Sequence, residues 1–298
     1  MDYLLTLASP IGHVIDKPLL QNADGSIWYV SNVTVMLVVN AIITMLIMIP
    51  AAKKIATGQN RTVDDFRSQG LLANLVESVC MYLRDEVFRD VLKEQTDRFA
   101  PILWTFFWYI LICNLVGLIP IADMTALMGI NHGHGIGGTA TQSIWVTGAL
   151  SIVAFLFYNV TAFVKDPKSY LLHMTGNAPI FMWPIMIPVE IMGTLIKPFA
   201  LAIRLFANMT GGHLVIAVLL SFIGPLFNAL GTGGGGAVST IAVLGAVGIN
   251  MLEVLVAFIQ AYIFTFLTCL FLGQLVVHEH EEHEEHDDEH APHAAAAH

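Results

Sequence analysis

Long runs of apolar residues, separated by short polar segments, dominate the sequence. Three of these runs contain no Asp, Glu, Lys or Arg and cover residues 33–52, 99–122 and 144–164. Two longer runs follow at 180–223 and 238–277, and they hold only a few charged residues. A helix needs roughly 20 apolar residues to cross a bilayer, and it satisfies its own backbone hydrogen bonds in hydrocarbon. The pattern therefore predicts an all-α polytopic membrane protein with about five membrane helices.

The last two runs are too long for one straight crossing, because a helix rises only about 1.5 Å per residue. We expect two long helices that tilt steeply, bend or fold back within the membrane. The first of them contains Pro184, Pro188 and Pro198, where bends are expected. Between the two runs, residues 224–237 include the glycine-rich stretch 231–236, which is expected to form a turn on the outer side.

Residues 71–98 have a different pattern from the apolar runs. Apolar residues recur at helical spacing from Leu72 to Val91, and charged residues such as Glu77 and Arg84 lie between them. This spacing predicts a helix with one apolar and one charged face. Such a helix lies at the membrane surface or packs against helices of a partner. A partly exposed helix that covers the bundle fits the pattern equally well.

Composition supports a membrane protein and excludes several other classes. Of the 298 residues, 56% are hydrophobic and only 12% are charged, and the mean hydropathy is +0.69, which argues against a soluble fold. Residues 1–277 are expected to form a single membrane domain. The net charge of −10 lies largely in the His-rich and acidic tail 278–298, which is predicted to be disordered and cytoplasmic. No strongly basic surface for nucleic acid remains. The cysteines are expected to be buried packing residues, since none has CxxC spacing: Cys80, Cys113 and Cys269.

The distribution of Lys and Arg predicts the orientation of the chain. Eight of these residues lie between Lys53 and Arg98, and Lys165 and Lys168 follow the third apolar run. Cytoplasmic loops carry an excess of Lys and Arg. The loops 121–143 and 224–237 contain neither. We therefore expect a multi-pass membrane protein with residues 1–32 outside and the C-terminus cytoplasmic.

The few charged and strongly polar residues inside the long apolar runs are the candidates for chemistry. They are Glu190, Lys197, Arg204, Asn208, His213, Glu253 and Gln260. A charge at the centre of a membrane helix costs roughly 2.5–3.5 kcal/mol on insertion scales, so such residues are functional by default. A structural ion pair between Arg204 and Glu253 is the alternative explanation.

Helical spacing places these residues on particular faces. Arg204 and Asn208 are four residues apart and share a face, and Glu253 and Gln260 lie two turns apart on one face of the next helix. If the two helices are antiparallel, the Glu253 carboxylate lies near the depth of His213 and the Gln260 amide near that of Arg204. A His or Glu side chain can pass on a proton, whereas an arginine effectively never deprotonates. The pattern thus suggests two proton relays separated by a fixed positive charge.

Three stretches resemble subunit a of the F-type ATP synthase. They are NLVGLIP at 114–120, PVEIMGTLIKPFALAIRLFANMTGGHL at 188–214 and LEVLVAFIQAYIFTFLT at 252–268. The resemblance covers essentially the whole chain, and RLFANM is highly specific. It implies a proton-translocating stator subunit of a bacterial plasma or inner membrane, not an enzyme by itself. It also implies two long tilted helices that form a hairpin against a ring of c subunits.

The resemblance also implies roles for individual residues. Arg204 resembles the essential arginine that faces the ring carboxylates and blocks proton leakage between two offset half-channels. Asn208, His213, Glu253 and Gln260 resemble residues of the outer half-channel and its neighbourhood, and Glu190 resembles an acid of the cytoplasmic half-channel. In the familiar version of the family an acid stands at the position of His213 and a histidine at that of Glu253. The exchange here favours spatial proximity of the two positions.

The partners that the resemblance implies are the c-subunit ring, b-type peripheral stalk subunits and membrane lipid. The transported ion is expected to be a proton, with Na⁺ as the alternative ion. No cofactor is expected, and no GxxxxGK[ST] phosphate loop occurs. A different function, a His-rich divalent-metal transporter, is suggested by the tail 278–298 and by the NHGHGIGG loop at 131–138.

Overall fold

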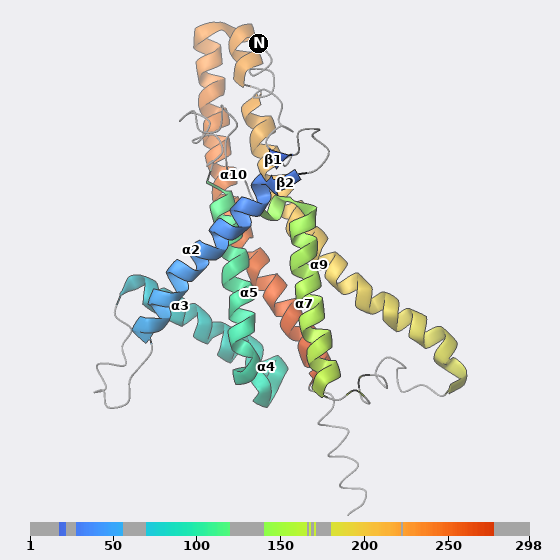
Figure 1. The fold of residues 1–298 in the computed structure, drawn as a ribbon. Coiled ribbons are helices and arrows are strands. Elements are labelled where there is room, and N and C mark those ends of the chain that lie inside the picture. The colour runs from blue at the N-terminus through green and yellow to red at the C-terminus, as the bar shows by residue number, and fades with distance from the viewer. Residues whose placement is uncertain are drawn as a thin grey trace, which may run out of the picture.

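The computed structural model of the chain is almost entirely helical (Figure 1). It describes residues 18–21, 28–55, 70–119, 140–165, 167, 170, 180–221 and 223–276. Five helical segments are long and apolar enough to cross a membrane: Asn32–Lys53, Leu71–Gly117, Ile144–Lys165, Trp183–Ser221 and Gly234–Val276. The prediction of an all-α polytopic membrane protein with about five membrane helices is confirmed. The expected tail 278–298 and the His-containing loop 131–138 lie outside the described residues.

A small sheet precedes the first membrane helix. Strands β1 (Pro18–Gln21) and β2 (Trp28–Ser31) pair antiparallel, within a segment that the sequence predicts only as a tail. The Ser31 hydroxyl oxygen then accepts a hydrogen bond of 3.1 Å from the Val33 N–H at the start of α2 (Asn32–Ile55). This bond satisfies one of the backbone donors that a helix start leaves unpaired. The last residue of the β1–β2 hairpin thus caps the start of the first membrane helix.

The predicted amphipathic helix at 71–98 is divided into several pieces. These are α3 (Leu71–Tyr82), the π-helical turn η2 (Leu83–Phe88), α4 (Arg89–Leu92) and the short 3₁₀ turn η3 (Lys93–Gln95), after which α5 (Thr96–Gly117) begins. Lys93 has a positive φ of 48°, a backbone conformation that non-glycine residues rarely adopt, and it marks the break before α5. Figure 1 shows α3 running at an angle to α5.

The buried face of this segment differs in part from the prediction. Val76, Leu83 and Val87 are buried as expected, whereas the Leu72 side chain is 69% exposed and Leu75 is 50% exposed. The π-helical turn shifts the register of the helix, so one straight apolar stripe cannot stay in contact with the bundle along its full length. The carboxy-terminal part of the segment therefore covers the bundle, and the first turns of α3 present leucines on the surface.

The core lies where α5, α7 (Ile144–Lys165) and α10 (Ile223–Val276) pack together. Aromatic side chains fill it, including Phe107, Tyr158 and Phe264, each at most 1% exposed. Small residues allow the helices to approach closely, because Ala154 and Ala261 are completely buried between them. Outside this core, large apolar side chains are exposed along several helices, which is the pattern of a surface that faces lipid or other membrane subunits.

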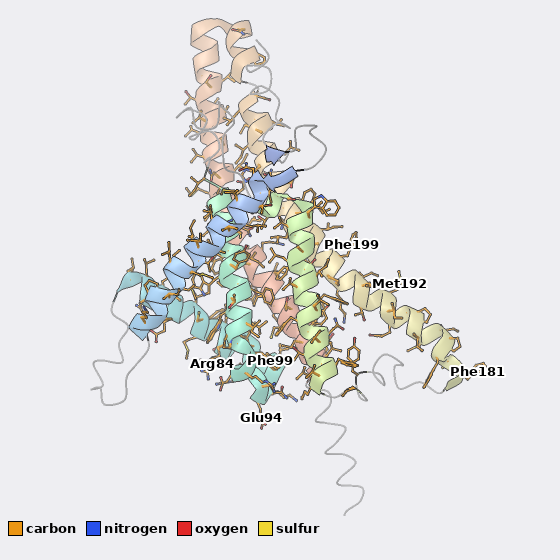
Figure 2. All side chains as sticks on the ribbon, viewed as in Figure 1. Arg84, Glu94, Phe99, Phe181, Met192 and Phe199 are labelled. Carbon is orange, nitrogen blue, oxygen red and sulfur yellow. The ribbon has the colours of Figure 1, made fainter. Side chains whose placement is uncertain are left out.

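The last two helices form a long hairpin. The first helix, α9 (Trp183–Ser221), follows the 3₁₀ turn η6 (Ile180–Met182) and contains Pro188 and Pro198. In Figure 1 the amino-terminal part of α9 leans away from the bundle. Figure 2 shows Phe181 in η6 and Met192 and Phe199 on α9, and their side chains are 92%, 58% and 64% exposed. Proline removes backbone hydrogen bonds and clashes with the preceding turn, so it favours bending here.

The connection in this hairpin differs from the sequence prediction. Residues 224–237, expected as a loop, are helical except at Gly231, where φ is 67° and ψ is −172°. This region of backbone space is essentially restricted to glycine. Gly231 alone takes the non-helical conformation, so the residues on either side of it can form helical hydrogen bonds despite the poor helix propensity of the other glycines. The turn is therefore confined to a single residue between two helical arms, and α10 folds back on itself in Figure 1.

Candidate functional site

Arg204 lies on α9 with its side chain exposed. No hydrogen bond or ion pair joins its guanidinium to any residue that the structure describes. The neighbouring side chains Phe199 and Ile203 are also exposed, at 64% and 41%. The chain therefore presents a permanent positive charge on an apolar surface, and no described residue forms an ion pair with it.

One turn further along α9, Asn208 connects the two arms of the hairpin. Its Nδ2 donates a hydrogen bond of 2.7 Å to Oε1 of Gln260 on α10. Gln260 is only 2% exposed. An interhelical amide bond in a membrane contributes about 0.6 kcal/mol on average, and up to about 1.7 kcal/mol. The bond fixes the register of α9 against α10 close to Arg204.

The Glu253 carboxyl lies deeper in the hairpin, where α10 faces Gly212. Its side chain is 7% exposed, and neither carboxyl oxygen has a hydrogen-bond partner among the described residues. A Cβ atom built on Gly212 would overlap Oε1 and would lie 2.8 Å from Cδ. Because Gly212 has no Cβ, the Glu253 carboxyl can lie directly against α9 at this position.

His213 follows Gly212 directly and is half-buried. The pairs Asn208 with Gln260 and Gly212 with Glu253 run in opposite directions along the two helices, so the arms are antiparallel. The carboxylate is thus at the level of His213 and the amide is near Arg204, as the spacing predicts for antiparallel helices. The alternative of an Arg204–Glu253 ion pair is wrong for this structure, because each group is without a hydrogen-bonding or ionic partner among the described residues.

Glu190 and Lys197 lie nearer the start of α9, away from the Arg204 cluster. Both line a small cavity that also touches Tyr158 and Asn159 of α7, Tyr170, and the end of α10. The Lys197 ammonium lies 4.8 Å from the centre of the Phe271 ring, a cation–π contact. The predicted site residues thus divide into an Arg204–Asn208–Gln260 group, a Glu253–Gly212–His213 group and a separate Glu190–Lys197 group.

Sequence reasoning missed several residues that complete these groups. Gly212 has no functional group, so only its contact with Glu253 reveals its importance. Nothing in the sequence distinguishes Tyr158 from the other aromatic residues of its apolar run. Asn114, in the recognised NLVGLIP stretch, is completely buried, accepts a hydrogen bond of 2.8 Å from the Thr141 hydroxyl and lies next to α10. A buried amide within an apolar run was the available signal for Asn114.

The site does not resemble a metal centre in the part of the chain that the structure describes. Among these residues, no group of three or more His, Cys, Asp or Glu side chains is placed to hold a metal ion. Carboxylate and imidazole ligands would have to converge for such a site. Cys80, Cys113 and Cys269 are buried and unpaired, as expected.

Fold and site together define a multi-pass helical membrane protein with polar groups arranged along a long antiparallel hairpin. The sequence profile of the family described as ATP synthase A chain matches residues 33–273, and the chain belongs to this family. Among its relatives is the ATP synthase subunit a of Chloroherpeton thalassium, 40% identical over 70% of this chain and 56% of that protein.

Two further relatives show the same extent of similarity. The ATP synthase subunit a of Myxococcus xanthus is 37% identical over 74% of this chain and 67% of its own length. The subunit a of Anaeromyxobacter dehalogenans strain 2CP-1 is 42% identical over 70% of this chain and 50% of its own length. The chain thus spans between 50% and 67% of the length of these three relatives.

Proposed function

We propose that this chain is the proton-translocating stator subunit of a rotary ATP synthase. In this role it forms two offset half-channels that lead to carboxylates on a ring of c subunits. Arg204 stands between the half-channels and prevents protons from passing directly from one to the other. The nucleotide chemistry takes place elsewhere in the complex, and b-type stalk subunits hold this chain in place.

The observation that carries the proposal is the exposed Arg204 guanidinium, which has no partner among the described residues. An uncompensated cation at membrane depth costs several kcal/mol, so an anion from outside the chain must approach it. A moving carboxylate on a partner meets this requirement. Guanidinium keeps its charge throughout, whereas a titratable cation could release a proton into the path.

The two remaining polar groups supply the half-channels. Glu253 and His213 lie farther along the hairpin than Arg204 and form the outer path, and Glu190 belongs to the cytoplasmic path. Each elementary charge that crosses the membrane potential releases about 2.3 kcal/mol per 100 mV, so several protons must be combined to make one ATP. A rotating ring can combine the free energy that several protons release. The positive-inside distribution of Lys and Arg supports an outside N-terminus and a cytoplasmic C-terminus.

Reconstitution with the c-subunit ring tests this function. Proton flux into vesicles is measured for the complex with the unchanged chain, with Arg204→Ala and with Arg84→Ala. Arg84 is a matched control, because its hydrogen bonds of 2.6 and 2.8 Å go to Asp97 on the surface of the bundle. We expect coupled, ring-dependent flux to be lost in Arg204→Ala and retained in Arg84→Ala. Zinc uptake by the chain without a ring would instead support the transporter.

A further inference from the structure

The carboxy-terminal ends of α7 and α10 meet, and one lysine joins them. Lys165 is the last residue of α7, and Val276 is the last residue of α10. The Lys165 Nζ donates a hydrogen bond of 2.8 Å to the Val276 carbonyl oxygen. In Figure 1 the two helix ends lie at the same side of the bundle. The bond therefore links two membrane helices through residues that are 111 positions apart in the chain.

Each of these helix ends carries a partial negative charge. The last carbonyl groups of an α-helix have no donor within the helix, and the aligned peptide dipoles place roughly half a negative elementary charge there. Two such ends repel each other when they lie together. The Lys165 ammonium lies at the end of its own helix and bonds to the end of the other. One cation thus compensates both helix ends.

Other contacts hold the same end of α10. The Val276 side chain is completely buried. A Cβ built on Gly273 would lie 3.0 Å from the Val91 carbonyl oxygen, so α4 and α10 approach closely at this glycine. The Phe271 ring packs 5.8 Å from the ring of Tyr158 on α7. The last turns of α10 are therefore held by α4 and by α7.

Nearer its middle, α10 has an open face. Met251 and Leu255 are exposed there, whereas Glu253 and Gln260 face the other arm of the hairpin. Glu253 lies roughly 35 Å along the axis from Val276, since a helix rises about 1.5 Å per residue. A packed helix moves along its axis as one rigid element. A bond that fixes its end thus also fixes the axial position of these two polar side chains.

We propose that Lys165 is a positioning residue, which fixes the axial position of α10 by joining its end to α7. This position keeps Gln260 opposite Asn208 on α9. The inference rests on the function proposed above, in which a moving ring of partner subunits pushes on the hairpin. A push on the open face of α10 must be resisted where the helix is held, and that is at its Lys165 end. Lys165 acts through this geometry and takes no part in proton transfer.

The test uses variants of one lysine in the complete reconstituted complex. Lys165→Met keeps an unbranched side chain and removes the charge and the donors, whereas Lys165→Arg keeps both. Lys53→Met is the matched control, because Lys53 also lies near the carboxy-terminal end of a membrane helix and its side chain is exposed. Proton flux into vesicles is measured for each variant.

A second measurement reports the register of the hairpin and needs no proton flow. Each lysine variant is combined with Asn208→Cys and Gln260→Cys, because these two side chains are hydrogen-bonded at 2.7 Å in the unchanged chain. The rate of disulfide formation between the two new cysteines is then followed under mild oxidation. The native cysteines are buried and provide a quiet background.

We expect Lys165→Met to slow the cross-linking and to lower the flux, each by roughly threefold to tenfold, as for one lost hydrogen bond that favours the aligned arrangement. Lys165→Arg and Lys53→Met should keep both rates. If Lys165→Met does not assemble, Lys165→Gln, which has a shorter and neutral donor, should show a smaller loss in the same direction.

Three results would overturn the proposal: unchanged cross-linking in the assembled Lys165 variants, an equal loss in Lys53→Met, or no rescue by Lys165→Arg. Failure of the proposed function is recognised separately. In that case flux is insensitive to Arg204→Ala, while Lys165→Met still slows the cross-linking.

Discussion

Gly212→Ala tests whether the position of the Glu253 carboxyl matters for proton flow, because the new methyl group would occupy space that the carboxyl fills. The Cβ would overlap Oε1 and would lie 2.8 Å from Cδ and 3.0 Å from Cγ of Glu253. All three atoms belong to the end of a flexible side chain, so the backbone can remain in place. We expect the carboxyl to rotate away from α9 and from the level of His213.

The size of the effect follows from this displacement. Forcing a side chain about 30° from its preferred rotamer costs about 0.5–1.5 kcal/mol. If the carboxyl must return to its original position to transfer a proton, this energetic cost would lower the proton flux roughly twofold to tenfold. Stability should hardly change, since Gly→Ala in a helix interior gains about 0.5–1 kcal/mol, which offsets a similar steric cost. Flux and stability are thus expected to separate in this variant.

The control is Gly148→Ala in α7, because nothing lies within 4 Å of a Cβ built at that glycine. It shares the gain in helix propensity but displaces no side chain. Proton flux is measured in reconstituted vesicles, and stability by thermal unfolding in detergent. Adding Glu253→Asp to Gly212→Ala shortens the acid by one methylene and should restore part of the flux. Unchanged flux in an assembled Gly212→Ala complex would refute the assignment of Glu253 to the path.

The other predictions concern the fixed charge, the buried acid and the packing of α4. Arg204→Lys should abolish coupled flux, because an ammonium can deprotonate and lacks the planar fork of guanidinium; normal ATP-driven pumping would contradict this. Glu253→Gln should lower driven flux much more than the yield of folded protein, both measured on the same preparation. In Gly273→Ala, the Cβ would lie 2.5 Å from Val91 Cγ1 and 3.0 Å from the Val91 carbonyl oxygen, so overpacking should cost about 1–3 kcal/mol in the unfolding free energy.

The membrane helices and the charged residues of the candidate site were predictable from sequence for clear physical reasons. Hydrocarbon excludes unpaired backbone groups, so apolar runs of sufficient length predict helices reliably. Charges at that depth are rare enough to stand out, which is how Arg204 and Glu253 were found. Helical spacing also predicted that the Gln260 amide lies near the depth of Arg204. This prediction succeeded because both helices are regular where they pair.

Features that depend on tertiary contact were not predictable. The helical structure of residues 224–237 differs from what their glycine content predicts, because propensity is a weak local preference that tertiary packing can override. The π-helical turn at Leu83–Phe88 changes the register of the helix, which leaves leucines of α3 exposed. No pattern of residues in the sequence indicates such a turn. Gly212 is significant only because of the side chain opposite to it, which belongs to another helix.

The contrast between Arg204 and Glu253 connects these observations to the proposed mechanism. Both are isolated charges in apolar helices, yet the guanidinium is exposed on the surface and the carboxyl is buried within the hairpin. In the proposed function, an anion on a partner compensates this exposed cation. The Glu253 carboxyl has no hydrogen-bond partner among the described residues. It can instead be satisfied by a proton or a water, which are small enough to enter. The Asn208–Gln260 bond holds the two helices together between these groups. In the proposed function, the hairpin thus keeps a charge that stays fixed apart from a group that can exchange protons, which is what a leak-free path to a moving partner requires.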